Sequence, residues 1–204
     1  MASVLSDHAP NTQLERPSLI PIKLVIAGGF AVGKTTFVGA ISDITPLTTE
    51  AAMTTAAVGV DNRGDVSTKT TTTVAMDFGK VAIDDRIVLY LFGTPGQDRF
   101  GFMWDDLIAG ALGAIVLIDS RRLDDSFPAL DYFESRDVPF VGAVNLFGGS
   151  LVHQLDDVRE TLDIAPDVPL VGTDARSREA VKDTLVTLVD HVLQRAYQRA
   201  QHGG

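Results

Sequence analysis

The chain has 204 residues, which suits one α/β domain and is short for two ordinary domains. It contains no cysteine, which excludes disulfides, thiolate chemistry, Cys-based zinc sites and prenyl or palmitoyl anchors. Its net charge is −10 with no basic cluster, which argues against nucleic acid or anionic lipid as direct partners. With no secretory signal pattern and no apolar run long enough for membrane insertion, a cytoplasmic protein is expected.

The predicted elements begin after a polar leader. Residues 1–18 lack periodicity and are predicted to be disordered, as are residues 201–204, which leaves a domain over 19–200. A β-branched run at 22–27 predicts a buried strand, followed by a glycine-rich loop and a helix over 34–42. Residues 44–67 are rich in Thr, Ala and Gly without a clear period. They predict a long mobile connection, a type of loop that is often functional.

The rest of the chain alternates between strands and helices. Alternation over 73–78 predicts a half-exposed strand that forms a hairpin with the buried strand at 87–92, turning at Asp84-Asp85. The clearest helix follows the apolar spacing from Val181 to Ala196. This order predicts an α/β fold with a mostly parallel six-stranded sheet, one antiparallel edge strand and helices on both faces. The remaining strands are predicted at 114–118, 140–144 and 168–171.

The first motif is a phosphate loop. The segment Gly28-Gly29-Phe30-Ala31-Val32-Gly33-Lys34-Thr35 fits G-x-x-x-x-G-K-[ST], and it lies between a predicted strand and a predicted helix. Its glycines let backbone N–H groups turn toward an anion, and the helix dipole adds positive potential. Lys34 is expected to reach the β- and γ-phosphates, and the Thr35 hydroxyl to ligate Mg²⁺. The predicted phosphate-binding residues here are Gly28, Phe30, Ala31, Val32, Gly33, Lys34, Thr35 and Thr36.

A second informative stretch is Phe92-Gly93-Thr94-Pro95-Gly96-Gln97, which follows the strand at 87–92. Together with residues 29–36, 70–79 and 102–104, it resembles the actinobacterial Ras-like GTPases that are encoded in conservon clusters. These proteins are relatives of the bacterial cell-polarity GTPases. The resemblance extends over residues 20–195 and implies a P-loop NTPase fold of the G-domain type.

The resemblance implies roles for four further positions. Gly96 corresponds to the switch II glycine whose N–H binds the γ-phosphate, and Gln97 to the residue that orients the attacking water. Gln97 and Lys34 are therefore the implied catalytic residues. Thr73 is similar to the switch I threonine that closes on Mg²⁺, with Thr72 as the alternative ligand. The implied metal ligands are Thr35 and Thr73.

Three positions depart from the Ras pattern. Gly93 stands where most P-loop GTPases carry an aspartate that steadies Mg²⁺ through water, so we expect looser metal binding. Phe30 replaces a glycine, and its bulk is expected to obstruct an arginine supplied by a partner. Gly148 replaces the aspartate of the guanine-reading N-K-x-D motif. That loss would forfeit about 1.5–3 kcal/mol per hydrogen bond.

Base recognition is then expected to rest on two short stretches. Asn145, at a strand end, is placed to hold the base and the neighbouring loop, with Leu146 beside it. Thr173-Asp174-Ala175-Arg176 resembles the later base loop, in which the Ala175 N–H would meet guanine O6 and reject adenine. Guanine is therefore favoured over adenine by a reduced margin. The predicted base-binding residues are Asn145, Leu146, Asp174, Ala175 and Arg176.

Two functions are consistent with these residues. The first is a regulatory GTPase that binds GTP or GDP with Mg²⁺, hydrolyses GTP slowly and signals through loops ordered by the γ-phosphate. The second, favoured by Gly93 and Gly148, is a non-catalytic or base-promiscuous (ATP/GTP) nucleotide-binding scaffold of a sensor-kinase complex. The resemblance also implies a roadblock-type regulatory protein and a membrane sensor kinase as partners, through which any peripheral membrane association would arise. Within Phe100 to Trp104, we expect Trp104 to be the exposed contact for the roadblock-type protein.

Overall fold

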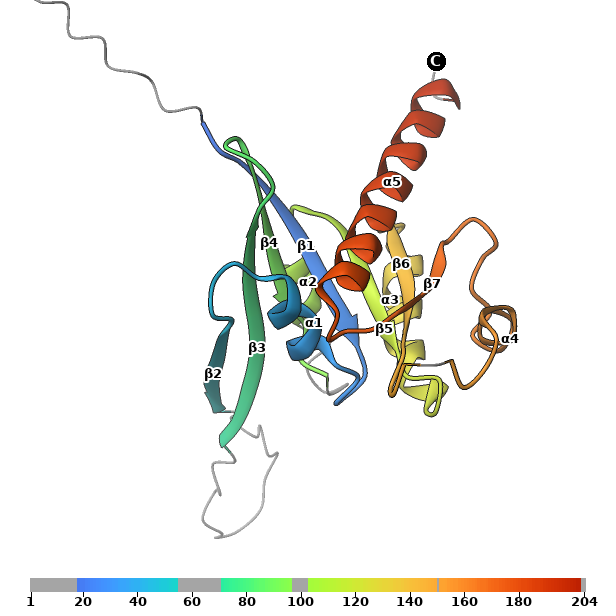
Figure 1. Cartoon of the computed structure of the whole chain (residues 1–204), viewed down its shortest axis with the longest axis horizontal. Helices are drawn as coiled ribbons and strands as arrows, with labels where there is room; N and C mark the ends of the chain where they lie inside the picture. The colour runs from blue at the N-terminus through green and yellow to red at the C-terminus, as the bar shows by residue number, and fades with distance from the viewer. Residues whose placement is uncertain (1–17, 55–70, 97–102, 150, 203–204) are drawn as a thin grey trace, which may run out of the picture.

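The computed structural model describes residues 18–54, 71–96, 103–149 and 151–202. These residues form one seven-stranded sheet in the order β2-β3-β4-β1-β5-β6-β7, with helices on both faces (Figure 1). The strands are β1 Ile20–Gly28, β2 Leu47–Thr54, β3 Thr71–Ala82, β4 Ile87–Gly93, β5 Ala111–Ile118, β6 Phe140–Asn145 and β7 Leu170–Thr173. The helices are α1 Lys34–Ile41, α2 Trp104–Ile108, α3 Phe127–Ser135, α4 Leu155–Thr161 and α5 Arg178–His202, with a short 3-10 helix, η2, at Leu123–Ser126.

The pairing of the strands confirms the predicted fold class. β1 runs parallel to both β4 and β5, and β6 runs parallel to β5 and β7. β3 is antiparallel to β4, as the predicted hairpin requires. Parallel strands linked by helices place their carboxyl ends at one edge of the sheet, which is where ligands bind in open α/β sheets.

The sheet has one strand more than the sequence predicts. β2, within the segment predicted to be a mobile connection, pairs antiparallel with β3 and takes the edge position outside it. The prediction of a connection is therefore wrong for 47–54, while 55–67 lies outside the described residues. An edge strand is held mainly by backbone hydrogen bonds to one neighbour, so the sequence Leu-Thr-Thr-Glu-Ala-Ala-Met-Thr needs no apolar alternation to form it.

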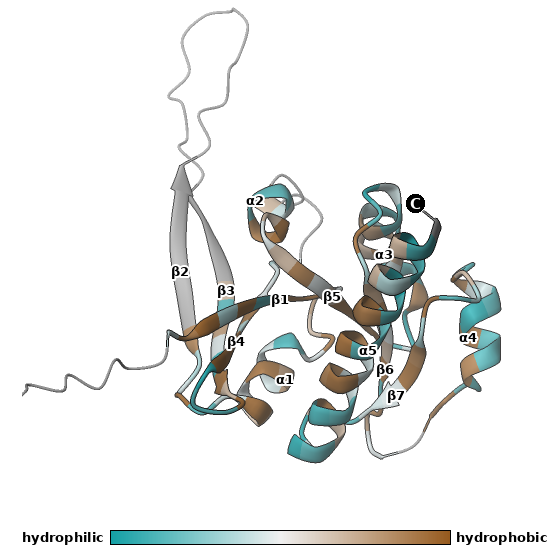
Figure 2. Cartoon of the chain, turned by 90° about the horizontal axis from the view of Figure 1, so that it is seen from above, coloured by the Kyte–Doolittle hydropathy of each residue, from teal (hydrophilic) through white to brown (hydrophobic). Residues whose placement is uncertain are grey.

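Each face of the sheet has its own apolar core, because successive residues of a strand point to opposite faces. In β1, Leu24 and Ile26 join the core under α1 and α5. Val25 and Ala27, which alternate with them, join the core under α2, α3 and α4. The central strands β1 and β5 are accordingly coloured mostly hydrophobic in Figure 2. A sheet buried on both faces provides a rigid base for the loops at its carboxyl edge.

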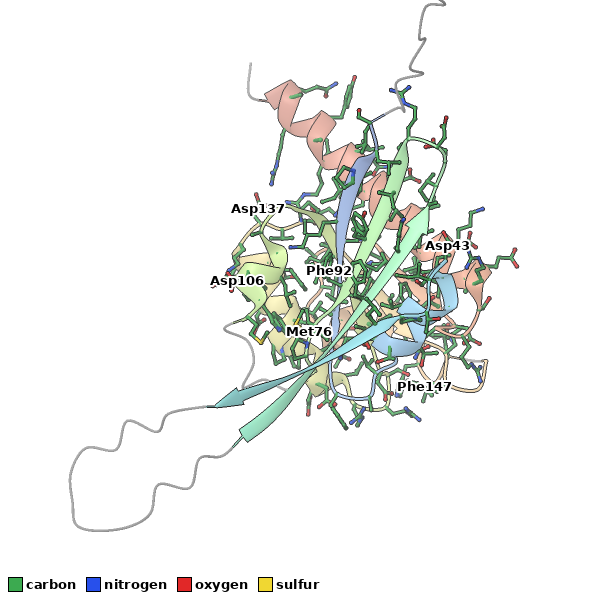
Figure 3. All side chains as sticks on the ribbon, turned by 90° about the vertical axis from the view of Figure 1, so that its left-hand side faces the viewer. Asp43, Met76, Phe92, Asp106, Asp137 and Phe147 are labelled. Carbon is green, nitrogen blue, oxygen red and sulfur yellow. The ribbon has the colours of Figure 1, made fainter. Side chains whose placement is uncertain are left out.

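Trp104 belongs to the second of these cores and is not exposed. It is 7% exposed, and its ring centroid lies 5.0 Å from that of Tyr132 and 6.0 Å from that of Phe133. Asp105 and Asp106, which suggested exposure, take the outer positions of the same short helix, where Figure 3 shows Asp106 at the outside of the molecule. The prediction that Trp104 is exposed is therefore wrong. The acidic neighbours indicate the exposed side of α2 and not the orientation of the indole.

The C-terminal helix is longer than the sequence predicts. α5 runs to His202, two residues past the predicted domain end at 200. In the part of the chain that the structure describes, no helix is both long and apolar enough to cross a bilayer. Gln97 and Phe100, which were named above from the sequence, lie outside the described ranges.

Candidate nucleotide-binding site

The phosphate loop joins β1 to α1 at the carboxyl edge of the sheet. Its backbone needs glycine at two points, since Gly28 has φ +134° and Gly33 has φ +109°. At Gly28 a Cβ atom would also lie 2.4 Å from the carbonyl oxygen of Leu117. α1 begins directly afterwards, and no side chain caps its first N–H groups. These donors are therefore available to an anion.

Lys34 lies inside this loop. Its Nζ donates to the carbonyl oxygens of Gly28, at 2.8 Å, and Gly29, at 2.7 Å, and the side chain is buried. Burial lowers the pKa of Lys34 to about 8, and the negative charge of Asp77 opposes that shift. The loop carbonyls thus already orient the ammonium group. Burial makes Lys34 easier to deprotonate, and the charge of Asp77 partly offsets this effect. The ammonium group would provide a positive charge to a phosphate group if one were bound over the loop.

Gly96 lies against the same lysine. A Cβ atom at position 96 would be 2.7 Å from Lys34 Nζ and 2.9 Å from the Cα of Phe30. Only glycine allows so close an approach. The segment after β4 therefore meets the phosphate loop beside Lys34, and the γ-phosphate contact that the resemblance implies for Gly96 stays a prediction.

A carboxylate lies beside Thr35 although Gly93 has none. The Thr35 hydroxyl donates to Oδ2 of Asp77 at 2.7 Å, and Asp77 is only 7% exposed. Asp77 lies in β3 directly opposite Gly93 of β4. A Cβ atom at Gly93 would be 3.0 Å from the Cβ of Asp77 and 3.2 Å from its Oδ2. Asp77 of the neighbouring strand therefore fills the space that Gly93 leaves, and the looser metal binding expected from Gly93 stays a prediction.

The oxygens of Thr35 and Asp77 are hard ligands of the kind that Mg²⁺ prefers. No group of three or more His, Cys, Asp or Glu that could hold a metal ion occurs in the described ranges. A metal ion here would therefore depend on phosphate oxygens as well. Both candidates for the switch I threonine are residues of β3, with Thr73 opposite Ala52 and Thr72 opposite Met53.

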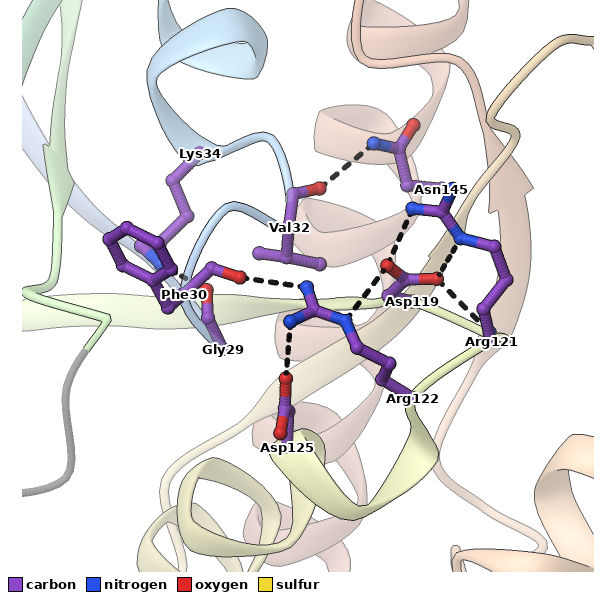
Figure 4. Close-up of polar contacts among 9 residues, drawn as sticks. All are labelled: Gly29, Phe30, Val32, Lys34, Asp119, Arg121, Arg122, Asp125 and Asn145. Carbon is purple, nitrogen blue, oxygen red and sulfur yellow. Dashed lines mark hydrogen bonds and ion pairs between the residues drawn. The ribbon is translucent and has the colours of Figure 1, made fainter.

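Asn145, at the end of β6, joins the phosphate loop to the loop after β7. Its Nδ2 donates to the carbonyl oxygen of Val32 at 2.9 Å (Figure 4), and its Oδ1 accepts the N–H of Ala175 at 3.2 Å. The side chain is buried, so both bonds are made away from water. The Ala175 N–H, which was expected to donate to a base oxygen, thus already donates to Asn145. A base oxygen would have to share this N–H donor with Asn145.

A hollow of about 230 Å³ lies between these two loops. That volume is below the ~300 Å³ at which ordinary ligand pockets begin, and it suits one part of a nucleotide. Gly148 has φ +89°, and no described atom lies within 4 Å of where its Cβ would be, so the aspartate position of N-K-x-D is open. The lining residues are Ala31, Gly33, Thr36, Asn145, Leu146, Phe147, Gly148, Asp174, Ala175 and Arg176.

Two contacts at this site were missed from the sequence. The Phe147 ring lies under the guanidinium of Arg121, 3.9 Å from its centroid, and Asp119 holds Arg121 with bonds of 2.8 and 2.7 Å. Arg122 donates to the carbonyl oxygen of Phe30 at 2.9 Å, which ties the segment after β5 to the phosphate loop (Figure 4). Phe30 itself is 64% exposed. The doublet Arg121-Arg122 after a buried strand was the available signal, but its partners are distant in sequence.

The fold and this loop define a P-loop nucleotide-binding protein with a GTPase-like G-domain fold. Residues 26–195 match the family model ATP_bind_1, described as a conserved hypothetical ATP binding protein, and the chain belongs to this family. An uncharacterized protein of Methanocaldococcus jannaschii is 30% identical over 121 residues, which cover 58% of this chain and 66% of that protein. The match leaves about a third of that relative uncovered.

Solved structures of similar shape include G domains. The G domain of the T. maritima FeoB iron transporter has a TM-score of 0.58 at 17% identity, covering 84% of this chain and 99% of that domain. The cytosolic domain of the same transporter in a GDP form has a TM-score of 0.56 at 16% identity, covering 85% of this chain and 64% of that chain. At these identities the likeness concerns the fold alone.

Proposed function

We propose that the chain is a guanine-nucleotide switch that binds GTP or GDP with Mg²⁺ and hydrolyses GTP slowly. The observation that carries the proposal is the contact between Gly96, Lys34 and the phosphate loop. A segment that closes on the lysine of a phosphate loop can report whether a terminal phosphate is present. The G-domain fold, shared with a transporter domain whose structure is a GDP form, supports this assignment.

In this proposal different residues bind the phosphates, hold the metal ion and orient the attacking water. The first N–H groups of α1 and the Lys34 ammonium bind the β- and γ-phosphates. Thr35, Asp77 and the switch I threonine, Thr73 or Thr72, hold Mg²⁺, which when bound neutralises charge on the phosphate oxygens. Gln97 orients the attacking water. Lys34 stabilises the negative charge that develops on the phosphate oxygens as the bond between the γ-phosphorus and GDP breaks.

Hydrolysis by purified protein tests the enzymatic part of the proposal. With GTP and Mg²⁺ we expect slow phosphate release that stops when EDTA removes the metal. Gln97→Leu is expected to lower the rate at least about tenfold with little change in GDP affinity, because the residue acts on water and not on the ground-state phosphates. Gln154→Leu, at an exposed glutamine before α4, is the control. Wild-type release no faster than in buffer would contradict the proposal.

That negative result would favour the second candidate function, a non-catalytic or base-promiscuous nucleotide-binding scaffold of a sensor-kinase complex. Two observations favour it: the open position at Gly148 and the family's description as ATP binding. ATP binding as tight as GTP binding, without hydrolysis of either nucleotide, would establish it.

We also propose partners on the basis of the resemblance in the stretch from 92 to 97, namely a roadblock-type protein and a sensor kinase. Phe30 is the candidate contact in place of Trp104. It is a large apolar side chain exposed beside Gly96, where a nucleotide-dependent segment meets the phosphate loop. Exposed aromatic residues of this kind are frequent anchors of interfaces.

The lowered pKa of Lys34 predicts that nucleotide affinity depends on pH. Above about pH 8 the free protein loses the Lys34 proton, and a bound phosphate, which needs the charge, must restore it. Affinity for GDP is therefore expected to fall by up to about tenfold per pH unit above pH ~8. Calorimetric titration at matched ionic strength measures this slope, and Lys34→Arg, which stays charged, should flatten it. A wild-type affinity that is constant across this range would contradict the prediction.

A further inference from the structure

The hollow of about 230 Å³ between the phosphate loop and the loop after β7, which we call the base-side hollow, is lined by a carboxylate even though Gly148 supplies none. Of the residues that line it, Asp174 is the acidic one. Asp174 follows β7 and precedes Ala175, whose N–H is the expected donor to a base oxygen. A carboxylate and an N–H group therefore lie side by side in the loop that borders the hollow.

Asp174 already binds a pair of parallel donors. Arg176 donates from Nε to Oδ1 at 2.9 Å and from Nη2 to Oδ2 at 2.8 Å, and its backbone N–H reaches Oδ1 at 3.0 Å. These bonds lower the pKa of Asp174 to about 2, with the side-chain bond from Arg176 as the largest cause. Asp174 is therefore an ionised group that only accepts hydrogen bonds at neutral pH.

Guanine offers the same pair of donors as the arginine. Its N1–H and N2–H₂ lie side by side on one edge, as Nε–H and Nη2–H₂ do in a guanidinium. Adenine presents an unprotonated N1 and a C–H group on that edge, and the N1 lone pair would face the carboxylate. The geometry in which Arg176 binds Asp174 is thus suited to guanine and unsuited to adenine.

The arginine can be displaced from this position. The Arg176 side chain is 63% exposed and that of Asp174 26% exposed, so water can solvate both groups when the pair separates. Ion pairs at such exposure add little stability. A base that enters the hollow can therefore take the place of the guanidinium at small cost, and Arg176 then moves into solvent.

We propose that Asp174 reads guanine by accepting hydrogen bonds from N1–H and N2–H₂, in place of the aspartate that is missing at Gly148. The inference rests on the proposed function, because it names the residue that sets the base specificity of the same site. Ala175 completes the recognition by donating to O6. Arg176 holds the carboxylate in position until the base arrives.

A panel of bases tests the inference in the full chain with Mg²⁺. The probes are GDP, IDP, XDP and ADP, with dissociation constants from calorimetry. IDP lacks the N2 amino group, and we expect wild type to bind it about tenfold or more weakly than GDP, the effect of one hydrogen bond to a charged group. Asp174→Asn should weaken GDP at least about tenfold. It should also strengthen XDP, whose C2 oxygen can accept from the new amide, and leave ADP nearly unchanged.

Two further variants complete the test. Asp43→Asn changes another carboxylate that pairs with an exposed arginine, Arg178, outside the lining of the hollow, and it should alter none of the four constants. Arg176→Ala should keep the preference for GDP over XDP and IDP, because the carboxylate remains.

The inference is overturned if Asp174→Asn binds GDP as wild type does, if it weakens GDP and ADP equally, or if Arg176→Ala loses the base preference as fully as Asp174→Asn. Failure of the proposed function looks different. In that case wild type binds none of the four nucleotides, or binds them without dependence on Lys34.

Discussion

Replacing Lys34 with alanine is expected to lower GDP affinity by about a hundredfold or more while the fold persists. The ammonium supplies hydrogen bonds to charged phosphate oxygens, each worth about 1.5–3 kcal/mol, and the loop already holds it in place for them. The lowered pKa means that the folded protein without nucleotide disfavours the charge on Lys34. Its removal therefore relieves a desolvation cost and should not unfold the chain.

Titration with a fluorescent GDP analogue measures this loss, and thermal unfolding checks the fold. Lys182→Ala is the matched control, because Lys182 is an exposed lysine of α5 that does not line the base-side hollow. Wild-type affinity in Lys34→Ala would contradict the assignment of residues 28–35 as a phosphate loop.

The second large effect is expected for Trp104→Ala, on stability. Truncating a buried aromatic residue costs about 3–5 kcal/mol, a large part of the ~5–15 kcal/mol by which domains are stable. Trp104 stacks on Phe133, with the ring planes 12° apart, and meets Tyr132 edge to face at 83°. The substitution would leave a cavity between α2 and α3 in the core they share.

The free energy of unfolding from urea titration measures the cost. Tyr197→Ala is the control, since Tyr197 is an aromatic residue of α5 that is 67% exposed, and it should change stability by less than about 0.5 kcal/mol. A stable Trp104→Ala protein would show that the indole does not support the core.

Features determined by neighbouring residues were predicted from the sequence. The phosphate loop is a continuous string, so its glycines, Lys34 and Thr35 could be identified without any knowledge of distant contacts. The central strands are continuous apolar runs because both faces of the sheet are covered. Both predictions depend only on local pattern, and the fold and position of the loop agree with them.

Features determined by pairing between distant segments were not predicted. β2 carries no apolar alternation because an edge strand needs only the hydrogen bonds of its neighbour β3. Asp77 fills the space beside Gly93 because the β3–β4 register sets these two residues opposite each other. Asp77 and Gly93 lie at nearly equal separations in sequence from the predicted turn at Asp84-Asp85. The turn therefore already indicated that these two residues would lie nearly opposite each other.

The orientation of single side chains could also not be predicted from the sequence. Trp104 precedes two acidic residues, so composition alone suggested the wrong face of α2. The contact of Arg121 with Phe147 joins segments after β5 and β6, and no local pattern relates them. Such contacts depend on strand order, which composition and periodicity do not contain.

Competitive binding of GDP and ADP to the wild-type chain with Mg²⁺ measures which base the site prefers. We expect GDP to bind at least about tenfold more tightly than ADP, because an N–H donor at Ala175 and a carboxylate acceptor at Asp174 both suit guanine. Equal affinities, or tighter binding of ADP, would contradict a guanine-nucleotide switch and would assign the site to a general or adenine nucleotide binder.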